Sequence, residues 1–73
     1  MIQEHDVVVL AQDVPAQHLQ AGDVGTVVMV HDGHGYEVEF ATLAGDTIAV
    51  VTLPADAVRP LRSREIAHVR EVA

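Results

Sequence analysis

Two histidines and an aspartate lie close together in the sequence, at His31, Asp32 and His34. Imidazole nitrogens and carboxylate oxygens together bind zinc and other divalent metals, so these residues are candidate metal ligands. They also belong to the stretch Asp32-Gly33-His34-Gly35, whose aspartate and glycines are typical of a hairpin connection. We therefore favour a hairpin turn with solvated histidines over a metal-binding turn, and we expect no cofactor.

Two carboxylates, Glu37 and Glu39, alternate along one predicted strand and share a face of it. Paired carboxylates can act as general acid and base when a cleft separates their pKa values. On an exposed sheet face they more often provide solubility and oppose edge pairing. The chain has one serine, Ser63, and neither cysteine nor lysine, so a nucleophile supported by a base is hard to assemble. We expect that the protein is not an enzyme.

The charge of the chain is strongly acidic and unevenly distributed. Eleven acidic residues face four arginines, and the formal net charge is -7. This charge repels nucleic-acid phosphates and anionic lipids, so we expect neither nucleic acid nor a membrane as a partner. The positive charges all lie in the last fifteen residues, at Arg59, Arg62, Arg64 and Arg70. An anion-binding alternative would have to use these four side chains.

Length and composition indicate one small domain. At 73 residues the chain has room for a single core, and without cysteine it has no disulfide to stabilise it. The first residues do not resemble a signal peptide, and no apolar run approaches the roughly 18 residues that cross a bilayer. We expect a soluble, cytoplasmic protein.

Glycine, proline and aspartate divide the chain into short β-rich segments. We expect strands at residues 6–10, 24–31, 36–41, 47–53 and 58–61. Gly25 indicates a bulge or a close backbone approach within the second strand. In the third strand, the alternation predicts that Tyr36, Val38 and Phe40 point inward.

Two connections between these strands have recognisable features. The loop at residues 11–21 contains Pro15, which is suited to the first position of a helical turn, and Leu19, which we expect to attach the loop to the core. Residues 54–57 are typical of a single 3₁₀ turn before the last strand.

These elements predict an all-β fold, namely a small five-stranded SH3-like barrel over residues 1–62. Residues 63–73 have a different pattern, with Ser63 as a candidate N-cap and Ile66, Val69 and Val72 at three-residue spacing. This pattern indicates either a short amphipathic helix or a flexible tail. So short a helix would be marginal without a surface to pack against.

The order of several motifs resembles a bacterial family of small proteins known only as a domain of unknown function. The resemblance covers roughly residues 2–61, and its motifs are Glu4-His5-Asp6-Val7-Val8-Val9-Leu10, Asp13-Val14-Pro15, Leu19, Gly22-Asp23-Val24-Gly25-Thr26-Val27-Val28, Tyr36-Glu37-Val38-Glu39-Phe40 and Val58-Arg59-Pro60. It implies an SH3-like β-barrel without an established activity or catalytic residues. The stretch from Gly22 to Val28 is also similar to the KOW motif of ribosomal and transcription proteins, which contacts RNA or protein.

The chain has more apolar strand than a small core needs. Val7–Leu10, Val27–Val30 and Ile48–Val51 are apolar on both faces, so either the strands coil and use both faces or one face is an interface. We therefore expect a non-enzymatic protein-interaction module, an accessory or antitoxin-like acidic protein that binds a protein partner or itself. The partner-binding candidates are Val8, Leu10, Met29, Val50, Ile66 and Val69. The alternatives are a KOW-like RNA-associated module that uses the C-terminal arginines and a metal-binding turn at residues 31–34.

Overall fold

The structure, a computed structural model, describes residues 1–32 and 34–72 of the chain. Within these residues the regular elements are β1 (Val7–Leu10), η1 (Pro15–Gln17), β2 (Val24–His31), β3 (Gly35–Ala41), β4 (Thr47–Pro54), η2 (Ala55–Ala57) and β5 (Val58–Pro60), where η is a 3₁₀ turn. The prediction of an all-β chain with five strands is confirmed, and each strand agrees with its expected range to within one residue at either end. The two 3₁₀ turns also form where the prolines indicated them.

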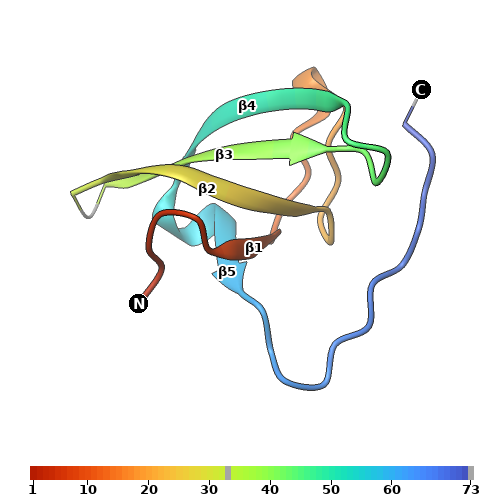
Figure 1. Cartoon of the computed structure of the whole chain (residues 1–73). Helices are drawn as coiled ribbons and strands as arrows, with labels where there is room; N and C mark the ends of the chain where they lie inside the picture. Colours follow the sequence, from red (N-terminus) through yellow and green to blue (C-terminus); the bar gives the residue numbers. More distant parts are fainter. Residues whose placement is uncertain (33, 73) are drawn as a thin grey trace.

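The strands form one open antiparallel sheet in the order β4-β3-β2-β1-β5 (Figure 1). The first four strands are neighbours in sequence order, and β5 returns to pair with β1, with Leu10 opposite Val58 and Val8 opposite Pro60. Antiparallel neighbours need only short connections, so a chain of this length can form the whole sheet. The two edges of the sheet are therefore β4 and β5.

The core lies on one side of this sheet. Its largest fully buried side chains are Val8, Leu10, Val27 and Val38, which come from three neighbouring strands. The other buried members of the cluster are Leu19, Phe40, Leu53, Ala57 and Val58. The predicted inward direction of Val38 and Phe40 is thus confirmed, and Tyr36 packs against the same cluster while staying half-buried.

β2 and β3 approach each other closely at Gly25. A Cβ atom built on Gly25 would lie 2.6 Å from Val38 Cγ1, 2.9 Å from Phe40 Cε1 and 2.9 Å from the Glu39 carbonyl oxygen. Of the two expectations for this residue, the structure therefore shows the close approach. The irregularity in the β2–β3 register lies farther along β2, between Val27 and Met29.

The long first loop is attached to the core as expected. Val14 and Leu19 exchange backbone hydrogen bonds of 2.9 and 3.2 Å, and the Leu19 side chain is only 3% exposed. Between them, His18 has a φ of 60°, which closes the turn that begins at Pro15. The other expected turn, at residues 32–35, includes Gly33, which lies outside the described residues.

The C-terminal segment, residues 61–72, contains no helix. Of the two alternatives predicted for residues 63–73, the helical one is therefore not what residues 63–72 adopt, and Ala73 lies outside the described residues. In the described part of the segment, the only backbone hydrogen bond runs from the Glu65 N–H to the Arg62 carbonyl oxygen, at 3.4 Å. A helix of this length is marginal without apolar packing, so side-chain contacts decide the path of the segment.

No helix in the described part of the chain has the length and apolar character needed to span a membrane.

Candidate functional site

We call the side of the sheet that faces away from the core the outer face. The cross-strand register identifies the residues that lie on it. Val7, Thr26, Glu39 and Val50 are opposite one another in one row across β1 to β4. Met29, Glu37 and Thr52 form the next row. Residues that are opposite in a ladder project to the same face. Both rows alternate with buried residues of the core, so they project outward.

Apolar side chains on the outer face remain open to solvent. Met29 is 46% exposed and Val50 is 53% exposed, and Val7 and Val24 have similar exposures. Single exposed apolar residues are ordinary, but neighbouring ones on one sheet face form a patch that a partner can cover. In the register, Thr26 and Glu39 lie between Val7 and Val50, and Glu37 lies between Met29 and Thr52. The exposed apolar side chains thus share the outer face with polar ones.

Two carboxylates lie in the middle of this apolar face. Glu37 Oε1 is 3.3 Å from His31 Nε2, and Glu39 Oε2 accepts a 2.6 Å hydrogen bond from the Thr47 hydroxyl. No lysine or arginine occurs in residues 1–58, so no permanent positive charge from the sheet strands β1 to β4 offsets them. The outer face is thus apolar and acidic together.

The predicted partner-binding residues separate into three groups. Met29 and Val50 lie on the outer face, where the prediction requires them to be exposed. Val8 and Leu10 are 0% and 1% exposed, so their assignment to a binding surface is wrong. β1 is apolar at every position, and sequence alone did not show which alternate set faces the core. Val7 is the exposed residue of that strand, and the expectation missed it.

The remaining two partner-binding candidates, Ile66 and Val69, lie in the C-terminal segment and are exposed. They belong to the C-terminal segment, which is not part of the sheet. The structure therefore does not join them to Met29 and Val50 in one strand face.

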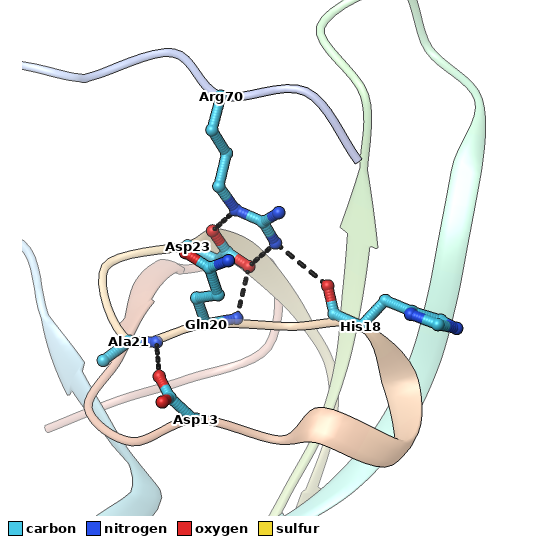
Figure 2. Close-up of polar contacts among 6 residues, drawn as sticks. All are labelled: Asp13, His18, Gln20, Ala21, Asp23 and Arg70. Atoms are coloured by element: carbon cyan, nitrogen blue, oxygen red, sulfur yellow. Dashed lines mark hydrogen bonds and ion pairs between the residues drawn. The ribbon is translucent and has the colours of Figure 1, made fainter. Parts of the chain in front are cut away.

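An ion pair attaches the C-terminal segment to the loop before β2 (Figure 2). Arg70 donates from Nε to Asp23 Oδ1 at 2.8 Å and from Nη2 to Asp23 Oδ2 at 2.6 Å, and Nη2 also reaches the His18 carbonyl oxygen at 3.0 Å. The hydrogen bonds from Arg70 lower the pKa of Asp23, and the Gln20 N–H adds to this effect against the opposing effect of burial. The arginine is thereby held by a carboxylate.

A second ion pair lies at the start of the segment. Arg59 donates to both oxygens of Glu65, at 2.9 and 2.5 Å, and the Arg62 N–H donates to Glu65 Oε1 at 2.6 Å. The Arg59 hydrogen bonds, followed by that backbone contact, lower the pKa of Glu65 to about 2. Of the four arginines in the anion-binding alternative, Arg59 and Arg70 are thus paired in two separate places. Arg62 and Arg64 are exposed and have no ion pair within the described residues.

An apolar groove of about 590 Å³ lies between the C-terminal segment and the sheet. Its apolar lining includes Leu19, Val24, Phe40, Leu43, Ile48 and Val69. The end of the segment and the β3–β4 connection lie at the same end of the sheet in Figure 1. This groove brings Val69 near the sheet, although at a different place from Met29.

The candidate metal ligands do not converge. His31 contacts Glu37, and the His34 N–H donates to the His31 carbonyl oxygen at 2.6 Å, as a turn requires. Across residues 1–32 and 34–72, no three histidine, cysteine, aspartate or glutamate residues are grouped so that they could hold a metal ion. The described residues of this turn therefore lend no support to the metal-binding alternative.

Comparison with known proteins agrees with the resemblance noted in the sequence. Neither the curated proteins nor the solved structures contain a match to this chain. A family described as a domain of unknown function (DUF4926) matches residues 4–60, which include the whole sheet. The match covers far more than half of the chain, so the protein is a member of the DUF4926 family.

Proposed function

We propose that this protein is a non-enzymatic interaction module that binds a basic protein partner through its outer face. The observation that carries the proposal is the pair of rows on that face, in which exposed Val50 and Met29 flank Glu39 and Glu37. Apolar side chains supply most of the free energy of association, and charged neighbours select the partner.

The topology supports a scaffold role. Four strands follow one another in the sheet, a 3₁₀ turn follows β4, and β5 returns to β1. This order is the one expected of an SH3-like barrel, and we propose that the bent sheet belongs to that class. A fold of this kind holds a sheet face rigid without a deep cavity, which suits binding rather than catalysis.

The charge distribution supports a basic partner. The net charge is -7, and two of the four arginines are already paired with Glu65 and Asp23. Opposite charge speeds encounter and excludes acidic competitors. This acidic charge suits an accessory or antitoxin-like protein of the bacterial cytoplasm. Such a protein would cover a basic surface on its partner.

Affinity purification from the native host with matched variants tests the proposal. A partner that binds the outer face should be retained by the wild-type protein and by Leu43→Glu, which adds charge at a fully exposed hairpin residue. It should be lost with Met29→Glu, which puts a charge among the apolar side chains of the outer face. The retained protein, once purified, should bind with an affinity that falls as salt is raised. A partner that Met29→Glu retains at full yield would overturn the proposal.

A further inference from the structure

The two edges of the sheet differ in how well they are protected against pairing. β5 has three residues, and they include Arg59, whose side chain is held by Glu65, and Pro60, which has no N–H to donate. Short length, charge and proline are the usual means of blocking an edge. β4 has eight residues, carries no charge, and has its single proline at the last position. Only one of the two edges is therefore blocked.

The far side of β4 has no backbone partner among the described residues. β4 pairs with β3 alone, and across residues 1–32 and 34–72 no backbone atom of β4 bonds to any other element. In an antiparallel pair, alternate residues direct their N–H and C=O groups away from the partner strand. About half of the backbone N–H and C=O groups along β4 thus point away from β3.

The side chains of β4 suit an added strand. Val50 and Thr52 lie opposite Glu39 and Glu37 on the outer face, and Val50 is more than half exposed. β-Branched residues of this kind favour extended pairing and pack against β-branched neighbours on a new strand. An eight-residue edge can accommodate a segment about 26 Å long.

Acidic residues flank this edge at both ends. Asp46 immediately precedes β4 and Asp56 closely follows it, and both are exposed. Glu39 projects from the neighbouring strand, opposite Val50. In an antiparallel pairing of two β4 edges, a second copy would bring its own acidic residues to the same place and its own charge of -7. A basic segment meets no such repulsion.

We infer that β4 is a strand-addition site for an extended segment of a basic partner, with alternating apolar residues and lysine or arginine at its ends. This inference rests on the proposed function and specifies how the partner is held. The main-chain hydrogen bonds of the added strand provide affinity, while the Val50 row and the terminal acids provide specificity. The added strand extends the outer face, so the body of the partner can cover Met29 as well.

A synthetic peptide isolates the edge from the rest of the interface. The probe is an acetylated and amidated peptide of alternating threonine and valine with two lysines at each end. Titration into the isotopically labelled full chain should slow amide hydrogen exchange at alternate residues of Thr47–Leu53. The amides of β5 serve as the internal control and should not change. A peptide with glutamates in place of the lysines should bind at least tenfold more weakly.

Two matched lysine variants separate the edge from the face. Val50→Lys should weaken the peptide about tenfold, because it removes an apolar cross-strand contact and adds like charge. Met29→Lys has a similar exposure but lies on β2, and should leave the peptide affinity within about twofold. Val50→Thr, which keeps the β-branched shape, provides a second variant if Val50→Lys lowers Tm.

Several outcomes would overturn the inference. Absence of binding at millimolar peptide, or binding without alternate protection in β4, would exclude strand addition. Concentration-dependent dimers that protect the same β4 amides without peptide would assign the edge to a second copy instead. None of these results would overturn the proposed function. That proposal is tested separately, by whether Met29→Glu fails to retain the partner in affinity purification.

Discussion

Arg70 and Asp23 are joined by two hydrogen bonds, of 2.8 and 2.6 Å, across a sequence separation of 47 residues. A forked guanidinium matches the two oxygens of a carboxylate, which makes such a pair more specific than a single contact. The pair fixes the end of the C-terminal segment against the loop that begins β2. The other ion pair between the segment and the sheet, Arg59–Glu65, lies at the start of the segment, so the order of residues 67–72 depends on the Arg70–Asp23 contact.

Replacement of Arg70 by alanine should therefore release the end of the C-terminal segment. We expect backbone NMR relaxation to show greater motion at residues 67–72, while the Tm of the sheet changes by only a few degrees because no core contact is lost. Arg64→Ala is the matched control, since Arg64 has no ion pair within the described residues. Unchanged backbone motion at residues 67–72 in Arg70→Ala would show that apolar contacts hold the segment.

Acid should release the same segment. Arg70 lowers the pKa of Asp23 from its usual 3.8, and Arg59 lowers the pKa of Glu65 from 4.5 to about 2. Because both pKa values are lower in the folded state, their contribution is complete above about pH 5 and is lost as the pH falls toward 2. Backbone relaxation of residues 67–72 should show increasing motion over that range.

The pH response has its own control. In Arg70→Ala, residues 67–72 should be mobile at neutral pH already and should show little further change with acid. A wild-type segment that stays rigid at a pH where both carboxylates are protonated would mean that the two ion pairs do not hold it.

Leu10 tests the distinction between core and surface in β1. Leu10→Ala should lower the free energy of unfolding by about 2 to 5 kcal/mol, because it leaves a cavity among fully buried side chains. Leu43→Ala makes the same chemical change at a residue that is 91% exposed and should alter stability by less than about 0.5 kcal/mol. Chemical denaturation of both variants measures the difference, and equal effects would contradict the assignment of Leu10 to the core.

Gly25 tests the close approach of β2 to β3. Gly25→Ala places a methyl group closer than van der Waals contact to Val38, Phe40 and the Glu39 backbone, and should cost about 1 to 3 kcal/mol. The neighbouring Thr26 projects to the outer face, so Thr26→Ala should cost less than about 1 kcal/mol. Thermal unfolding of the two variants provides the comparison. A Gly25→Ala protein as stable as the wild type would show that the strands can separate there without cost.

Local signals in the sequence were enough for the strands and the turns. Alternation in Tyr36-Glu37-Val38-Glu39-Phe40 identified an inward and an outward set, because successive side chains of a strand point to opposite faces. Pro15 and Pro54 marked the two 3₁₀ turns, because proline restricts the backbone around itself. Leu19 was expected in the core as the large apolar side chain near the end of the first loop.

The residues of the binding surface could not be predicted from such local signals. β1 is apolar at every position, so period-two alternation has no contrast to detect, and Val8 and Leu10 were placed on the surface in error. Which set faces inward depends on pairing with β2 and β5, and those contacts are remote in sequence. The path of the C-terminal segment is a similar case, because the spacing of Ile66 and Val69 allowed a helix.

By itself, the sequence determined the number and order of the strands, the turns between them and the acidic character of the surface. Those features depend on neighbouring residues and on composition. The tertiary structure decided which apolar residues are buried, that Arg59 and Arg70 are paired, and that β4 is an unblocked edge. Each of these depends on contacts between residues far apart in the chain, and only the folded sheet brings them together.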